Sequence, residues 1–396
     1  LYDKYKEHNS LLWDRNSINK SQSTGYFKDI TLPLLRGDMI SFVQNLILED
    51  YKYFVFTVTY YSFDASYYIS SLIKNLSPSS FIIWEGAAIN SKSERVIETF
   101  KNGIVDVGIV PESEETISHL MHHLKTEQSY HLLPGLISSH SLKSKKLNPI
   151  AHPVDIHSLP FPNFQDLDLK KYKSQELPIR LSRGCIANCT FCNLFATDRS
   201  YRVRNASSVI KEIRYHKLQY DISQFFFLDS LINGSLQPFL SLIDGMEELN
   251  CTWTATCRVD QDLTPEVLLK MYQSGCRNLR VGFESNSKDV LDSINKATTP
   301  SLNQSFINNV KNSGIKIHGN FLIGFPGETK QNFNQTLNFI HRNKIFLSRV
   351  ITGQSLVIDK NSYISKNLDQ FNISTDANGA IKLDHNKEWI DTKNIV

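Results

Sequence analysis

Three of the six cysteines in this chain lie within eight residues, at Cys185, Cys189 and Cys192. Cysteine thiolates hold iron–sulfur clusters, and a cluster with four irons normally takes four of them. The spacing Cys-x3-Cys-x2-Cys lets one loop bind three corners of a 4Fe-4S cluster. The fourth iron is then open to a small molecule, so we expect these cysteines to hold a reactive cluster.

Two other interpretations of the cysteines stay open. A structural zinc ion takes four ligands, usually as two separated pairs, and no second cysteine pair occurs in the chain. Core packing is common for a free cysteine, but it gives no reason for three of them in one short stretch. A non-catalytic zinc- or cluster-binding protein is therefore kept as an alternative.

The composition points to no macromolecular partner. The 43 basic and 40 acidic residues leave a net charge of only +3, without a long block of like charge, so we expect no nucleic-acid partner. No apolar stretch approaches the roughly 18 residues that span a bilayer. The six cysteines are not spread like the disulfide framework of a secreted protein, which favours a cytoplasmic location.

Residues 1–150 are expected to form a Rossmann-like, doubly wound parallel sheet. Strand-like and helix-like runs alternate, and the strand-like runs are apolar throughout, as is typical of strands covered on both faces. The chain starts at Leu1, with neither an initiator Met nor the pattern of a signal peptide, so we expect an internal start and a domain truncated at its N-terminus. The runs are strands at 53–59, 81–84 and 104–110, and helices at 64–76, 91–101 and 114–125.

A proline-rich linker at 151–178 is expected to precede a second domain. Over 179–360 the strand and helix signals repeat about six times, which predicts a partial (β/α)6 barrel of the TIM type. Residues 361–396 are interpreted as the start of a C-terminal extension. The barrel strands are expected near 179–182, 223–228, 252–258, 278–283, 316–323 and 346–351.

Several further motifs carry a family resemblance. They are Leu-Pro-Phe-Pro-Asn-Phe at 159–164, Tyr-Arg-Val-Arg at 201–204, Phe-Leu-Asp-Ser-Leu-Ile-Asn-Gly at 227–234, Gly-Phe-Glu-Ser at 282–285 and Gly-Phe-Pro-Gly-Glu-Thr at 324–329. With the cysteines, they resemble the radical SAM superfamily, in its branch with an N-terminal cobalamin (B12)-binding-type domain. The resemblance implies that S-adenosylmethionine binds the open iron and is cleaved to a 5'-deoxyadenosyl radical.

The same resemblance implies roles for single residues around S-adenosylmethionine. Phe191 is expected near the adenine, with core packing as the alternative. Asp229 is expected near the amino end of the cofactor, or else as the cap of a turn. Glu284 is expected to contact the ribose or the amino group, with an ion pair to Arg258 or Lys296 as its alternative.

Three further positions lie at or near the ends of barrel strands. Arg258, at the end of 252–258, is a candidate partner for the carboxylate of S-adenosylmethionine. Gly324 lies in a stretch that resembles the family's adenine-contacting strand, where a glycine allows close backbone approach, and a role only in the turn into the next helix is its alternative. Cys257 is a candidate hydrogen donor to a substrate radical, and core packing is its alternative.

The N-terminal domain decides which reaction is expected. A cobalamin-binding-type domain implies methyl transfer from methylcobalamin to an unactivated carbon. The chain departs from the family pattern with Pro-Glu-Ser-Glu at 111–114 and Glu-Gly-Ala at 85–87, and it has no Asp-x-His-x-x-Gly motif. A radical isomerase or cyclase without cobalamin is therefore kept as an alternative. The family also implies an electron donor such as flavodoxin or ferredoxin, and a small-molecule or peptide substrate.

Overall fold

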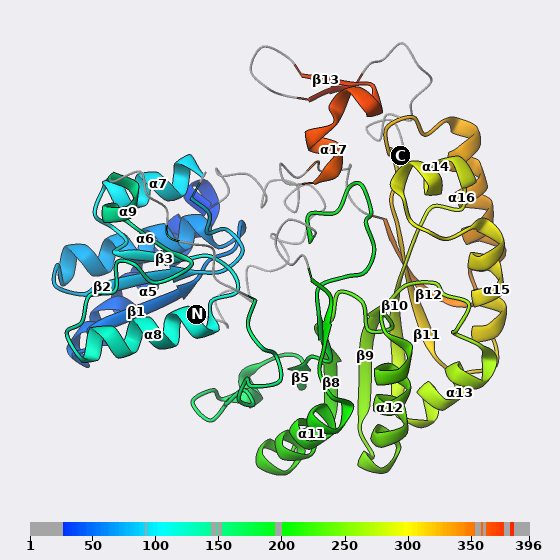
Figure 1. Cartoon of the computed structure of the whole chain (residues 1–396), viewed down its shortest axis with the longest axis horizontal. Helices are drawn as coiled ribbons and strands as arrows, with labels where there is room; N and C mark the ends of the chain where they lie inside the picture. The colour runs from blue at the N-terminus through cyan, green and yellow to red at the C-terminus, as the bar shows by residue number, and fades with distance from the viewer. Residues whose placement is uncertain are drawn as a thin grey trace. The chain divides into compact units, whose positions relative to one another are not determined.

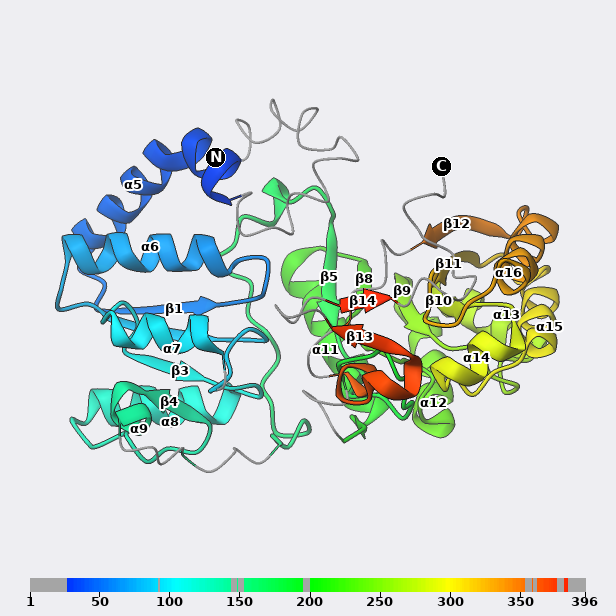
Figure 2. The same ribbon diagram turned by 90° about the horizontal axis from the view of Figure 1, so that it is seen from above.

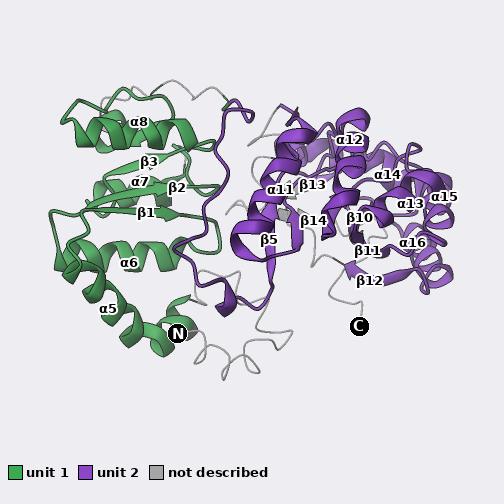
Figure 3. Cartoon of the chain, turned by 90° about the horizontal axis from the view of Figure 1, so that it is seen from below, with its two compact units in different colours: residues 1–154 green, residues 155–396 purple. Residues whose placement is uncertain are grey.

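The computed structural model describes residues 27–91, 93–143, 148, 153–194, 200–352, 358, 362–375 and 381–383. It divides into two compact units, residues 1–154 (unit 1) and 155–396 (unit 2), which Figure 3 colours separately. The expected start of the chain and residues 384–396 of the expected extension lie outside the described ranges. Among the described helices, none is both long and apolar enough to cross a bilayer.

Unit 1 is built on a four-stranded sheet in the order β1-β2-β3-β4. The first three strands are parallel, and β4 runs antiparallel to β3. Figure 2 shows α6 and α7 running alongside the strands. The elements are α5 (Leu32–Leu48), β1 (Tyr53–Thr57), α6 (Phe63–Leu76), β2 (Phe81–Glu85), α7 (Glu94–Lys101), β3 (Val107–Ile109), α8 (Glu114–Lys125), β4 (Leu136–Ser138) and α9 (Ser139–Lys143).

Helices cover both faces of this sheet. On one face Trp84 of β2 packs in a buried cluster with Val43 of α5 and Phe100 of α7. The neighbouring Ile83 points to the opposite face, where it packs near Leu120 of α8. Adjacent residues of a strand face opposite sides, so an apolar strand without alternation requires two covered faces. The predicted α/β class with a parallel sheet is confirmed.

Unit 2 is built on a six-stranded parallel sheet in the order β12-β11-β10-β9-β8-β5. The two outermost strands do not pair with each other, so the barrel is open, as predicted. The strands are β5 (Glu176–Ile179), β8 (Gln224–Phe227), β9 (Thr252–Cys257), β10 (Cys276–Glu284), β11 (Lys316–Phe321) and β12 (Leu347–Thr352). The helices between them are α11 (Ala206–Tyr220), α12 (Leu236–Met246), α13 (Pro265–Gln273), α14 (Lys288–Ile294), α15 (Pro300–Val310) and α16 (Lys330–Arg342).

Shorter elements complete unit 2. Two-residue strands precede and follow the cysteine stretch, and a small helix and hairpin lie near the C-terminus. They are β6 (Ser182–Arg183), β7 (Arg202–Val203), α17 (Tyr363–Lys366), β13 (Ile373–Thr375) and β14 (Ile381–Leu383).

Side-chain caps start α13 and α16, the helices that follow β9 and β11. The Thr264 hydroxyl accepts from the backbone N–H of Val267, and Pro265 occupies the first position of α13. Thr329 and Asn332 form a reciprocal capping box at the start of α16. These caps fix where each helix leaves its loop, and the loops at the strand ends are where a barrel carries its chemistry.

The two faces of the unit 2 sheet differ in character. Leu279, Val281 and Phe283 of β10 belong to the large buried cluster on the side of the helices, which lie along that side in Figure 1. Arg280 and Gly282 alternate with them and face the other way. We call this second side the inner face, and it also carries Phe226, Thr254, Thr256, Asn278, His318, Asn320, Arg349 and Ile351.

Candidate active site

Backbone groups of the cysteine loop form hydrogen bonds to its own thiols. Cys185, Cys189 and Cys192 are all free and half-buried. The backbone N–H of Ala187 donates to Sγ of Cys185 at 3.4 Å, and the backbone of Leu194 hydrogen-bonds to Cys192. Such N–H···S contacts favour the thiolate, which is the form that binds iron.

The loop is anchored to segments more than one hundred residues away. The backbone N–H of Thr190 donates to the carbonyl of Ile294 at 2.8 Å, at the end of α14. The Asn295 side chain donates to the carbonyl of Asn188 at 3.0 Å. The carbonyl of Thr190 accepts from the backbone of Ile364, in α17, at 2.9 Å. The loop is therefore held in place by its surroundings as well as by its own turns.

Asp229 fixes the strand end that leads into this loop. Its carboxylate is 3% exposed and accepts from the backbone N–H of Leu181 at 3.0 Å, and from the N–H and hydroxyl of Ser182 at 2.5 and 2.6 Å. Burial raises the pKa of Asp229, against a lowering by these hydrogen bonds. Both oxygens are thus occupied by the chain itself, and the geometry favours support of the loop over the expected cofactor contact.

Glu284 and Lys296 form a nearly buried ion pair. Their atoms Oε1 and Nζ are 2.9 Å apart, and their side chains are 14% and 13% exposed. A Cβ at Gly282 would lie 2.6 Å from Oε1 and 2.8 Å from Nζ, so the glycine makes room for the pair. Glu284 itself has a φ of +61°, at a β-bulge in β10. The ion pair is the alternative that the sequence left open for Glu284.

Lys296 links this pair to the cysteine loop. It is close enough to influence the pKa of both Cys189 and Cys192. Burial acts to lower the pKa of Lys296, but Glu284 and Cys189 outweigh it and the net shift is upward. The side chain therefore stays a cation beside the thiols. The sequence predicts Lys296 only as an alternative ion-pair partner for Glu284. Its position beside the cysteines is not predicted from the sequence.

Arg258 lies close to the same group. Its guanidinium donates to the carbonyl of Ala297 at 2.9 Å, and its backbone N–H donates to the Asn233 side chain at 3.1 Å. It also acts on the pKa of Lys296, which places two cations near the end of β9 and β10. Such a pair of cations suits the carboxylate of an amino acid.

Cys257 lies in the core of unit 2. It lies on the helix-facing side of β9 with Trp253 and Ala255, in the large buried cluster. Its side chain is 3% exposed, and burial raises its pKa to about 12. This placement agrees with the core-packing alternative and speaks against a hydrogen donor to a substrate.

Phe191 and Gly324 lie near the same loop. Phe191 packs against a buried cluster that includes Ile294 and Phe325, so packing contributes to its position. Gly324 has a φ of +78° and donates its N–H to Glu328 at 2.6 Å. Glu328 is 1% exposed, and its hydrogen bond to Gly324 is not predicted from the sequence.

A cavity of about 570 Å³ opens beside the cysteine loop. This is within the usual size range of ligand sites. Its lining residues come from the loop, from the end of α14 and from α17, and are Asn188, Cys189, Thr190, Cys192, Asn295, Tyr363 and Lys366.

Three free cysteine thiols on one loop suit an iron–sulfur cluster, because such clusters are held by thiolates. Within the described ranges, no group of three His, Cys, Asp or Glu side chains is placed to hold a single metal ion. Burial raises the pKa of the Cys189 and Cys192 thiols, so iron must displace their protons on binding.

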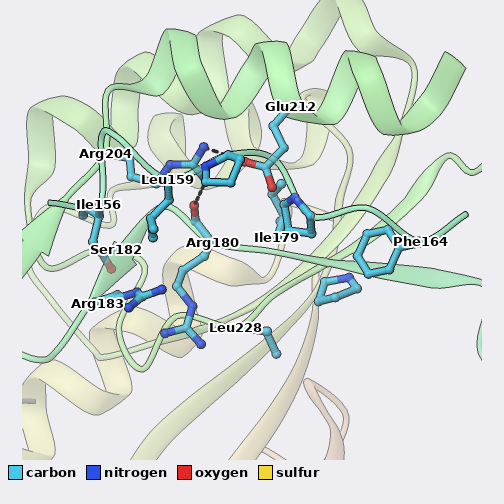
Figure 4. A pocket seen from close by; sticks show the side chains of 13 residues that line it. Ile156, Leu159, Phe164, Ile179, Arg180, Ser182, Arg183, Arg204, Glu212 and Leu228 are labelled. Carbon is cyan, nitrogen blue, oxygen red and sulfur yellow. Dashed lines mark hydrogen bonds and ion pairs between the residues drawn. The ribbon is translucent and has the colours of Figure 1, made fainter. Parts of the chain in front are cut away.

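A second, smaller cavity of about 230 Å³ lies beside the edge strand β5. Figure 4 shows Arg204 and Glu212 on one side of it, with their side chains turned toward each other. Nη2 of Arg204 lies 2.5 Å from Oε2 of Glu212, and Nη1 donates to the carbonyl of Arg180 at 2.9 Å. These contacts connect α11 to the end of β5. We therefore interpret Arg204 as a structural support for the segment that leads into the cysteine loop.

In unit 1 the loops at the carboxyl ends of the strands are closely packed and joined by side-chain hydrogen bonds. The carboxyl edge is where doubly wound sheets bind ligands. The hydroxyls of Thr57 and Ser113 both donate to the Glu85 carboxylate, the latter at 3.1 Å. Gly86 has a φ of +107°, and a Cβ there would lie 2.8 Å from a backbone oxygen. Tyr60 is 55% exposed at the same edge.

Comparisons with known proteins agree with this geometry. Residues 179–340 match the family model of the radical SAM superfamily. An uncharacterized methyltransferase of Pyrococcus horikoshii is 27% identical over 69% of this chain and 60% of its own length. The bacteriochlorophyllide d C-12(1)-methyltransferase of Chlorobaculum tepidum is 33% identical over 44% of this chain and 39% of its own length.

A solved structure extends the likeness to both units. The cobalamin-dependent S-adenosylmethionine radical enzyme OxsB, with aqua-cobalamin and S-adenosylmethionine bound, matches with a TM-score of 0.72 at 18% identity. The match covers 84% of this chain and 54% of that one, so the chain spans only part of its relatives' length. At this identity the likeness concerns the fold. The match to the family model identifies residues 179–340 as the part of this chain that is similar to radical SAM domains.

Proposed function

We propose that this chain is a cobalamin-dependent radical SAM methyltransferase. Cys185, Cys189 and Cys192 hold a 4Fe-4S cluster, and the methyl group goes to an unactivated carbon of the substrate. The observation that carries the proposal is the set of three free thiols on one anchored loop, at the strand ends of a radical SAM domain.

The bound cluster supplies one electron that cleaves S-adenosylmethionine to a 5'-deoxyadenosyl radical. The chain's own residues orient the cofactor. Glu284 and Arg258 bind its ribose and amino-acid part, which is supported by their common neighbour Lys296. Phe191 and the backbone near Gly324 line the adenine side. Asp229 acts on the loop rather than on the cofactor, because its oxygens accept from Leu181 and Ser182.

Cobalamin binding at the carboxyl edge of unit 1 is the second part of the proposal. The close packing around Glu85 and Gly86 supports it, as do the cobalamin bound to OxsB and the methyltransferase names of the relatives. We assign residues 1–150 to the cobalamin-binding-like domain, 151–178 to the linker, 179–360 to the barrel and 361–396 to the extension.

The remaining components follow from the chemistry. The cluster needs an electron donor such as flavodoxin or ferredoxin, and the substrate is a small molecule or a peptide. Six free cysteines suit a reducing compartment, so we propose the cytoplasm.

Anaerobic reconstitution with iron and sulfide tests both parts. We expect the chain to bind close to four irons per protein by general cluster chemistry, to release 5'-deoxyadenosine, and to retain added cobalamin through gel filtration. Alanine at Cys185, Cys189 or Cys192 should abolish iron binding. Cys251→Ala is the matched control, because Cys251 is buried outside the loop, and it should bind iron normally.

Each part fails in its own way. Zinc binding without iron contradicts the cluster. Release of 5'-deoxyadenosine without retention of cobalamin contradicts the methyltransferase and favours the isomerase or cyclase alternative.

A further inference from the structure

Three basic side chains lie side by side on the inner face of the unit 2 sheet. His318 of β11 is paired in register with Arg280 of β10 on one side and Arg349 of β12 on the other. Lys316, two residues before His318, faces the same way. Arg280 and Arg349 are exposed and His318 is half-buried, so this inner-face row is accessible to a ligand.

No carboxylate in the described part of the chain balances the row. The ion pairs found there involve other side chains. Like charges directly across neighbouring strands destabilise a sheet. Burial lowers the pKa of His318, and the neighbouring cations Arg280, Arg349 and Lys316 lower it further. An anion on this face would relieve that repulsion.

Arg280 is also held in a fixed orientation. Its guanidinium lies 4.8 Å from the ring centroid of Phe226, which is on the inner face of β8. Stacking on an aromatic ring fixes the plane of a guanidinium and leaves its N–H edge available for hydrogen bonds. Thr256, the register partner of Arg280 on β9, adds a hydroxyl. This arrangement suits a planar or tetrahedral oxyanion attached to an apolar group.

We propose that Arg280 and Arg349, with His318 between them, bind an oxyanion of the substrate on the inner face. The oxyanion is a carboxylate or a phosphate. The proposal rests on the proposed function, since it treats the inner face as the substrate side of the barrel. Arg280 lies four residues before Glu284 on β10, about 13 Å along the strand. The anionic group therefore binds well away from the carbon that reacts.

Binding of two small probes to the full chain tests the site. Phenyl phosphate and phenylacetate carry the two candidate oxyanions on the same apolar ring. At low ionic strength, isothermal titration should detect one or both. Arg280→Gln and Arg349→Gln should each weaken the bound probe about tenfold, because each removes a charge-assisted hydrogen bond. The tighter probe identifies the oxyanion.

Two further variants secure the result. Arg214→Gln removes an exposed arginine on α11, outside the row, and should bind the probes like the wild type. Arg280→Lys keeps the charge and loses the planar fork, so it should fall between wild type and Arg280→Gln. If Arg280→Gln fails to fold, Arg349→Gln, at an exposed position of the edge strand, still decides the matter.

The outcomes separate this proposal from the proposed function. Failure of both probes to bind the wild-type chain, or equal binding by wild type and the arginine variants, overturns the oxyanion site. Release of 5'-deoxyadenosine by the wild-type chain is measured in parallel. Release without probe binding contradicts only the oxyanion site, and probe binding without release contradicts only the proposed function.

Discussion

Oε1 of Glu284 and Nζ of Lys296 lie 2.9 Å apart, in the space that a Cβ at Gly282 would occupy. We expect Gly282→Ala to displace the pair. Both atoms are at the ends of flexible side chains, so the free energy of unfolding should fall by only about 1 kcal/mol. The affinity for S-adenosylmethionine should fall about tenfold, because the pair helps to orient it. Urea unfolding and anaerobic cofactor titration measure the two effects.

Gly275→Ala is the matched control for this variant. Gly275 has a φ of +101°, and a Cβ there would lie 1.9 Å from the backbone oxygen of Cys251. Backbone cannot move aside as a side chain can, so we expect a loss of about 3 kcal/mol or more. A loss of stability in Gly282→Ala as large as that in Gly275→Ala would contradict the first prediction.

The ion pair itself should show strong energetic coupling. Glu284→Gln or Lys296→Met alone leaves an unpaired charge that is mostly buried, at a cost of about 3 kcal/mol. The double variant should cost less than the sum of the single variants by more than about 1 kcal/mol. A double-mutant cycle in urea measures this coupling.

An exposed pair provides the control for that cycle. Lys270 and Asp244 lie 3.3 Å apart, and both side chains are 60% exposed. Surface pairs contribute little, so their coupling should stay within about 0.5 kcal/mol. Equal coupling in the two pairs would count against a special role for Glu284 and Lys296.

Asp229→Asn should loosen the cysteine loop. An amide presents one oxygen and an NH2 group to the donors of Leu181 and Ser182, so at least one hydrogen bond is lost. We expect a loss of stability of about 2 kcal/mol and a lower ratio of iron to protein after reconstitution. Asp244→Asn, at an exposed position of α12, should change neither. Normal iron loading by Asp229→Asn would remove Asp229 from its supporting role.

Local patterns predicted most of the fold. Helix α8 occupies 114–125, the range that its apolar stripe predicts, and the six barrel strands lie close to their expected places. Strand β4 was missed because it has three residues and joins the sheet antiparallel, which no local pattern encodes. Helix α5 was missed although it is long, since it contains Pro33 and Gly37 and buries little of its surface.

The candidate site was predictable only where its residues are neighbours in sequence. The cysteine loop is a local pattern, whereas the contact of Asp229 with Ser182 spans 47 residues. The alternation of side chains along a strand is a signal for Cys257. It follows the apolar Trp253 and Ala255 at every second position, so it shares their buried side. The cations of the inner-face row come from three strands, and only the register brings them together.

His318 gives the folded chain a pH dependence of definite sign. Burial, followed by Arg280, Arg349 and Lys316, lowers its pKa from the ordinary value of 6.5. The unfolded chain therefore binds a proton more readily, and the free energy of unfolding should fall as the pH falls through that value. His318→Gln removes this contribution. Its melting temperature should fall less than that of the wild type between about pH 7.5 and 5.5.

The neighbouring cations provide the control for this pH effect. Arg349→Gln keeps the imidazole and removes one of the charges that lower its pKa, so its melting temperature should show a pH slope between those of wild type and His318→Gln. Phenyl phosphate bound to the row should act in the same direction, because an anion beside His318 stabilises the imidazolium and raises its pKa. Identical pH slopes in all three proteins would mean that the row does not act on His318.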